Sequence, residues 1–185
     1  MPLRRAAISA VVFSLRGVQR IAKGLYWRGW PEKHEFAYMS PNYTIAAMLL
    51  AGPGAGLADA DALHALRWTT QVPCKALIST LGASPKPPHP TVVYRPRRNH
   101  RRAELNWTEV TVLEAVSVFW MSEEPWHECL DKIRSGVSTR RMPWCAPIRP
   151  DKLRWAAETE NEATVDALHL LQEVSSEIDK MSAVV

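Results

Sequence analysis

The sequence has few cysteines and no long apolar run, and each shortage excludes a class of protein. The three cysteines in 185 residues, Cys74, Cys129 and Cys145, are too few to hold a fold of this length by disulfides. An odd number also suits reduced thiols in a cytosol. No apolar stretch approaches the roughly 18 to 20 residues that a membrane-spanning helix needs. We therefore expect a cytoplasmic protein with no membrane partner and one main core.

Motifs for catalysis and metal binding are also lacking. Gly52-Pro53-Gly54-Ala55-Gly56 is not followed by the Gly-Lys-Ser/Thr of a phosphate-binding loop, so a helix-to-helix turn is expected there. His127 and Cys129 are spaced so that a helix would point them to different sides, and no second ligand pair stands near Cys145. The sequence therefore predicts no enzyme, no cofactor and no metal site.

Acidic residues are missing from the first thirty positions, although the formal net charge of the chain is only +4. This segment carries six basic residues and 95–102 carries another five, whereas 150–185 has three basic and eight acidic residues. The cationic segments suit a phosphate backbone, which would repel the acidic end. The charge pattern therefore indicates a protein with two functional faces.

The first thirty residues predict a basic helix followed by a hairpin. Apolar residues from Ile8 to Leu15 recur at helical spacing, and β-prone runs at 18–21 and 25–27 flank a turn that contains Gly24. This order is typical of the second half of a winged helix-turn-helix domain, whose helix enters the major groove and whose wing touches phosphates. The candidate DNA-binding residues are Arg4, Arg5, Ser9, Arg16, Arg20, Lys23 and Arg28.

Two other interpretations of this segment stay open. Residues 1–15 have the charged and apolar parts of a secretory signal, although no small-x-small cleavage site follows. The helix could instead pack on the core with its arginines solvated, which is the usual fate of surface charge.

From position 43 onward the pattern predicts an α/β (α+β) fold, in which helices flank a small sheet. Helices are expected at 43–50 and 59–66, the second with an acidic cap, and strands at 74–81 and 91–94. A stiff, proline-rich loop joins the two strands.

The later part of the chain predicts further helices. Asn106 and Glu109 have the spacing of a capping box, and an apolar face from Val112 to Trp120 follows them. Other helices are expected at 125–133, 151–157 and 162–181, with acidic residues opposite the apolar face of the last one. Core packing is the ordinary explanation for the tryptophans at these helical positions, Trp107, Trp120, Trp126 and Trp155.

Residues 95–102 hold the densest charge in the chain and allow two interpretations. One is a second phosphate-binding patch, for RNA or DNA. The other is a solvated loop paired with the acidic C-terminal helix. The arginines concerned are Arg95, Arg97, Arg98, Arg101 and Arg102.

Two segments resemble the abortive-infection AbiEi-type antitoxins. The segment Ile21-Ala22-Lys23-Gly24-Leu25-Tyr26-Trp27 is similar to the wing of that family. Residues 62–73 are similar to its pattern Ala-Leu-x-x-Leu-Gly-x-Thr-Gln-Val-Pro, with Arg67 in place of the glycine and one additional residue before Thr70. The resemblance covers about residues 4–133.

The resemblance implies an N-terminal winged-helix DNA-binding domain, an α/β domain and a role as antitoxin of a type IV toxin–antitoxin or phage-defence pair. Such antitoxins repress their own operon by binding double-stranded operator DNA, and their partner is a nucleotidyltransferase-like toxin. Arg4, Arg5 and Ser9 match the recognition-helix region and Lys23 matches the wing. The helices that precede the recognition helix in this family are missing. We therefore expect either a true start upstream, or a remnant that packs on the α/β domain and has lost operator binding.

The expected organisation has three parts: a partial winged helix at 1–30, an AbiEi-like α/β domain at 41–135 and a helical C-terminal extension at 136–185. The expected function is that of an antitoxin-like, DNA-binding transcriptional regulator. The alternative is an orphan phage-type defence or interaction protein, which binds a protein partner without touching DNA.

Overall fold

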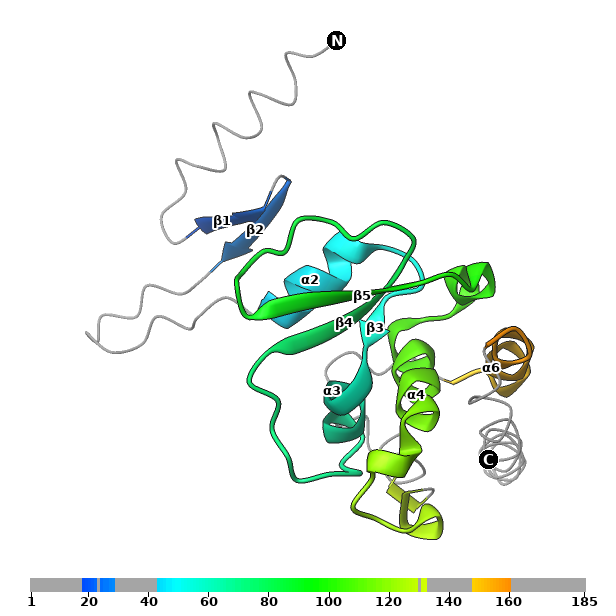
Figure 1. Ribbon diagram of the computed structural model, residues 1–185. Helices are drawn as coiled ribbons and strands as arrows, with labels where there is room; N and C mark the ends of the chain where they lie inside the picture. Colours follow the sequence, from blue (N-terminus) through cyan, green and yellow to red (C-terminus); the bar gives the residue numbers. More distant parts are fainter. Residues whose placement is uncertain (1–17, 23, 29–42, 130, 133–147, 161–185) are drawn as a thin grey trace, which may run out of the picture.

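The computed structural model describes residues 18–22, 24–28, 43–129, 131–132 and 148–160 (Figure 1). These residues form helices and a small mixed sheet, which confirms the expected α/β class. The expected recognition helix and the expected helix at 162–181 lie outside the described residues.

The N-terminal hairpin forms where the sequence predicts it. Strand β1 (Val18–Ala22) pairs antiparallel with β2 (Leu25–Arg28), and the two make a separate two-stranded sheet. Gly24 in the turn has a φ of +80°, a conformation that glycine adopts without steric cost.

A three-stranded sheet forms the centre of the fold. Its order is β3 (Gly56–Leu57), β4 (Ala76–Leu81) and β5 (Val92–Arg97), with β3 antiparallel and β5 parallel to β4. The expected helix-to-helix turn at 52–56 therefore needs correction, because its last residue begins strand β3.

The parallel pair β4 and β5 is joined by a loop instead of a helix. A six-residue strand is about 20 Å long, and the chain must travel back over that length before a parallel strand can start. An extended, proline-rich segment advances about 3.1 Å per residue. The ten residues 82–91 can therefore return without a helix, and in Figure 1 this loop runs back along the sheet.

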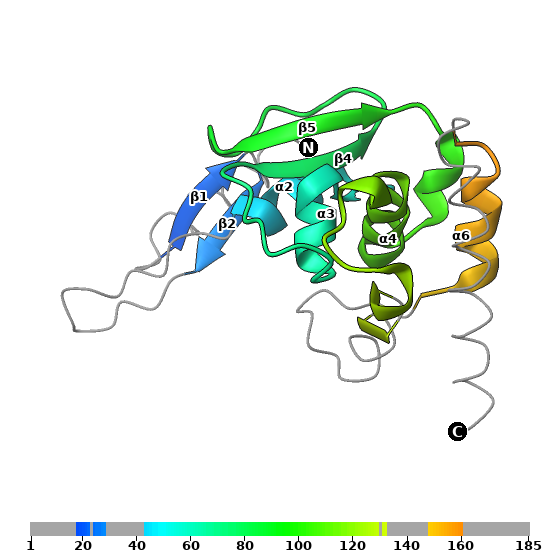
Figure 2. The same ribbon diagram turned by 60° about the horizontal axis from the view of Figure 1, so that its bottom comes forward.

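The helices pack against the sheet and against one another. They are α2 (Tyr43–Ala51), α3 (Asp59–Ala65), α4 (Trp107–Ser117) and α6 (Pro150–Ala157), together with the 3-10 helices η1 (His100–Glu104) and η2 (Phe119–Met121). In Figure 2, α3 and α4 lie below β4 and β5, and α6 lies beside α4.

Helix α4 is the central element of the core. Every residue from Thr108 to Val116 is buried, and both hydrogen bonds of the expected capping box between Asn106 and Glu109 are present. The expected apolar face is confirmed for Val112, Leu113 and Val116. It is wrong for Trp120, which is 81% exposed. The α-helix ends at Ser117, so the helical spacing no longer decides where Trp120 points.

Helix α3 does not have the expected acidic cap. Its N-cap is Ala58, which makes no side-chain capping bond, while Asp59 lies in the left-handed region with a φ of 49°. The carboxylate of Asp61 instead accepts a hydrogen bond from the backbone N–H of Leu77 and so ties α3 to β4. Partial burial of Asp61 raises its pKa to about 6.

Arg67 occupies a backbone position that favours glycine. It follows α3 with a φ of 62°, and the N–H of Trp68 donates to the carbonyl of Leu63 across the helix end. This is the left-handed helix termination at which glycine is the commonest residue. The pattern that Arg67 breaks in the resemblance has glycine at this same position.

The substitution Arg67→Gly should stabilise the protein. Relief of the left-handed strain should raise the free energy of unfolding by up to about 1 kcal/mol, partly offset by the greater freedom of glycine in the unfolded chain. Arg67→Ala is the matched control, because it removes the same side chain and keeps the strain. Urea unfolding measures both variants, and equal stability of the two would contradict this account.

The stability of the protein should also depend on the pKa of Asp61. A carboxyl group whose pKa is raised by folding favours the folded state when it is protonated, so its contribution is lost as the pH rises from about 4 to about 6. Asp61→Asn cannot titrate but keeps an oxygen for the N–H of Leu77. Its unfolding free energy should change less between these pH values than that of the wild type. Identical pH profiles would show that Asp61 titrates normally.

Candidate functional site

The arginines of 95–102 lie at the end of β5 and in η1, where a buried ion pair organises them. The side chain of Arg102 is 2% exposed and that of Glu114 is fully buried. Arg102 donates from Nη1 to a Glu114 oxygen and to Ser79 Oγ, the latter at 3.0 Å. Its Nε donates to Glu160 Oε1 at 2.6 Å.

Arg97 binds the same buried carboxylate from the other side. It donates from Nε and Nη2 to the two oxygens of Glu114 at 2.9 and 2.6 Å, and from Nη2 to Asp59 at 3.3 Å. Burial alone would raise the pKa of Glu114, but the hydrogen bonds and charges of Arg97 and Arg102 hold it below its usual value. Glu114 therefore stays ionised inside the protein.

Two further arginines form pairs nearer to the surface. Arg95 Nε lies 3.1 Å from Asp59 Oδ2. Arg101 Nη1 donates to the carbonyl of Trp155 at 2.6 Å and to Glu158 at 3.0 Å, and its guanidinium lies 4.8 Å from the centre of the Trp155 ring. We call Arg95, Arg97, Arg101 and Arg102 with Asp59, Glu114, Glu158 and Glu160 the arginine network.

Of the five arginines expected to form a phosphate-binding patch, Arg102 needs correction. Arg102 lies inside the protein, where no phosphate backbone can contact it. Three others already have carboxylate partners. Arg98 is exposed and makes no ion pair with any described residue. The sequence analysis also missed Glu114, although a single acidic residue within the apolar run from Val110 to Val116 is the signal that could have identified it.

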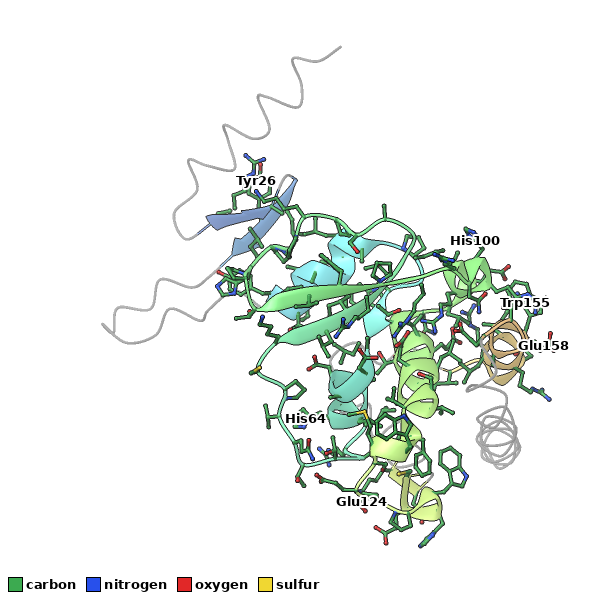
Figure 3. The ribbon with its side chains drawn as sticks, viewed as in Figure 1. Tyr26, His64, His100, Glu124, Trp155 and Glu158 are labelled. Atoms are coloured by element: carbon green, nitrogen blue, oxygen red, sulfur yellow. The ribbon has the colours of Figure 1, made fainter. Side chains whose placement is uncertain are left out.

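The structure brings part of the predicted DNA-binding set onto one hairpin. Arg20 in β1 is exposed, and its Nε donates to the carbonyl of Ala22 at 3.2 Å. Arg28 ends β2. Figure 3 labels Tyr26 on this hairpin, which lies at the end of the described molecule opposite to His100 and Trp155. Outside the described residues lie Arg4, Arg5, Ser9, Arg16 and Lys23.

The Thr-Gln segment of the resemblance has a structural role. The carboxylate of Glu123 accepts hydrogen bonds from the backbone N–H of Thr70 at 2.7 Å, from its hydroxyl at 2.9 Å and from Gln71 Nε2 at 3.2 Å. These bonds, first of all that from the Thr70 backbone, lower the pKa of Glu123. They fix the loop after α3 to the segment after η2.

An aromatic cluster supports this attachment. Trp68 is fully buried, a position that the sequence analysis missed, and its Nε1 donates to the carbonyl of Cys129 at 3.3 Å. Phe119 and Trp126 pack edge to face against it. Core packing, the ordinary explanation for the tryptophans, therefore applies to Trp126, which packs against the core.

The described residues contain no cluster of three or more histidine, cysteine, aspartate or glutamate side chains that could hold a metal ion. Among the described helices, none is both long enough and apolar enough to cross a bilayer. No family model, no curated protein and no solved structure matches the chain.

The buried pair should be the largest electrostatic contribution to the stability of the fold. Arg102→Met leaves two carboxylates, Glu114 and Glu160, without their shared partner. Removing one member of a buried pair costs about 3 to 5 kcal/mol. Arg98→Met, four residues away on the exposed surface, should change the unfolding free energy by less than about 0.5 kcal/mol. Chemical denaturation of the two variants measures both values, and equal losses would contradict the central role of Arg102.

Proposed function

We propose that this protein is a cytoplasmic, non-enzymatic, DNA-binding transcriptional regulator of the AbiEi antitoxin type. Its operator would be double-stranded DNA and its partner a nucleotidyltransferase-like toxin. The observation that carries the proposal is the hairpin β1–β2, which forms a two-stranded sheet of its own. It has the strand order and the glycine turn of a wing, and residues 18–28 contain three basic residues and no acidic one.

The charges of the rest of the described chain support the hairpin as the DNA-contacting element. Most arginines of 95–102 are held by carboxylates, so the attraction that they exert on a polyanion is largely cancelled. Arg20, by contrast, is exposed and bonds only to a backbone carbonyl among the described residues. The exposed positive charge of Arg20 is therefore the better match for DNA phosphates.

The helix end at Arg67 supports the resemblance itself. Counted from Ala62, the family pattern has glycine at position 67, and Arg67 adopts the left-handed conformation in this chain. Likewise, the Thr-Gln pair of the pattern makes specific hydrogen bonds to Glu123. Both features give the segment that carries the resemblance a defined structural role in this chain.

The second candidate function is that of a defence or interaction protein that binds a protein partner without DNA. It is favoured by the exposed apolar residues of η2, since Trp120 is 81% and Met121 is 39% exposed. Large aromatic residues on a surface are typical of protein–protein contacts.

The test measures binding to DNA by fluorescence anisotropy over a range of salt concentrations. The probes are a duplex that covers the region directly upstream of the gene and a random duplex of equal length. Wild-type protein should prefer the upstream duplex. Arg20→Glu combined with Lys23→Glu should weaken binding and reduce the salt slope by about two units, because each lost phosphate contact removes roughly 0.9.

Arg154→Glu is the matched control, because Arg154 is an exposed basic residue of α6 at the other end of the molecule. This variant should keep the wild-type slope. Equal effects of the two variants would mean that only overall charge matters and would exclude the hairpin as the contact. Absence of binding to either duplex would favour the second candidate function.

A further inference from the structure

A pocket of about 640 Å³ opens beside the arginine network. Residues 96–101, at the end of β5 and the start of η1, form one wall, and Thr159 and Glu160, just after α6, form the other. Figure 3 labels His100 on η1, and Trp155 and Glu158 on the neighbouring α6 region. This volume lies within the range of pockets that bind small molecules.

The position of the pocket in the fold is one where ligands commonly bind. Strands β4 and β5 run parallel and end together, because their last residues, Leu81 and Arg97, are register partners. In open α/β sheets, small ligands bind outside the carboxyl ends of parallel strands. The pocket begins at the carboxyl end of β5.

Two guanidinium groups of the pocket wall are held in place before any ligand arrives. Glu114 and Asp59 hold Arg97 through its Nε and Nη2, and Trp155 and Glu158 hold Arg101 through its Nη1. Within the described part of the chain, Arg97 Nη1 and the Nε and Nη2 of Arg101 make no other hydrogen bond. Donors held in this way bind an anion with a smaller loss of conformational entropy.

The ion pairs around the pocket leave one positive charge without a carboxylate partner among the described residues. Five arginines of 95–102 face four carboxylates of the network. Arg98 has no carboxylate partner among the described residues, and it lines the pocket together with the exposed His100. Glu160 also lines the pocket, but its Oε1 already accepts bonds from Asn99 at 2.7 Å and Arg102 at 2.6 Å.

We propose that this pocket binds a small phosphorylated ligand of mononucleotide size, whose phosphate is held by Arg98, Arg101 and Arg97. The inference goes beyond the proposed DNA binding and uses different residues. A small ligand fits better than a nucleic acid backbone, because the pocket has walls on two sides, and Glu158, 61% exposed beside the pocket residue Arg101, would repel the phosphates of a long polyanion.

Isothermal titration calorimetry of the full chain at low salt tests the proposal. The probes are inorganic phosphate, the four ribonucleoside 5′-monophosphates and the corresponding nucleosides. We expect saturable binding, at one site per chain, of at least one monophosphate, tighter than that of inorganic phosphate and of its nucleoside. Arg98→Ala should weaken this binding about tenfold or more, as the loss of a charged hydrogen bond does.

Arg154→Ala is the control, since it removes an equal charge from an exposed position that does not line the pocket. It should leave the affinity within about twofold of the wild type. The proposal is overturned if no monophosphate binds saturably, if the nucleoside binds as tightly, or if both variants lose affinity equally. A further result would also overturn the proposal: duplex DNA displaces the bound monophosphate from the wild type but not from a variant with a charge-reversed hairpin. The monophosphate and the DNA would then compete for the hairpin, and the pocket would not be the binding site.

Discussion

The buried contact between Arg102 and Glu114 is the constraint on which the rest of the described structure depends. Removing two charges from water costs several kcal/mol each, and the cost is met only if both groups are fully hydrogen-bonded. Satisfying Arg102 requires Ser79 of β4 and Glu160 after α6, and satisfying Glu114 also requires Arg97 of β5. One ion pair therefore fixes the relative positions of two strands, the central helix and a segment almost sixty residues further along the chain.

The same constraint divides the basic residues into two kinds. Those that stabilise the fold have carboxylates within hydrogen-bond distance and exert little attraction at long range. Those that are exposed and have no such partner among the described residues, represented by Arg20 on the hairpin and Arg98 beside the pocket, remain attractive to anions. Because Tyr26 of the hairpin and His100 of the pocket wall lie at opposite ends of the described molecule (Figure 3), a polyanion on the hairpin and a small anion in the pocket need not compete.

Local signals in the sequence predicted local structure, and tertiary contacts decided the rest. The hairpin around Gly24 and the capping box of Asn106 each depend on residues within a few positions of one another, so both could be predicted. Arg98 and Arg102 are indistinguishable in sequence, because the burial of Arg102 is set by Glu114 and Glu160, which are distant in sequence or belong to other elements. Distant contacts also explain why the expected helix cap at Asp59 was wrong. The actual partners of Asp59, Arg95 and Arg97, lie on a strand more than thirty residues away.

The part of the predicted family resemblance at 62–73 describes the fold more directly than the function. Arg67 stands where the helix end requires a left-handed residue, and Thr70 and Gln71 attach the following loop to Glu123. A chain could keep these features to preserve its α/β body while losing its ability to bind DNA, because none of them contributes to the exposed charge of the hairpin. The hairpin, in turn, could bind phosphates on an unrelated body. The two kinds of support for a regulatory function are therefore independent, and the DNA-binding part of the proposal depends on the charges of 18–28 alone.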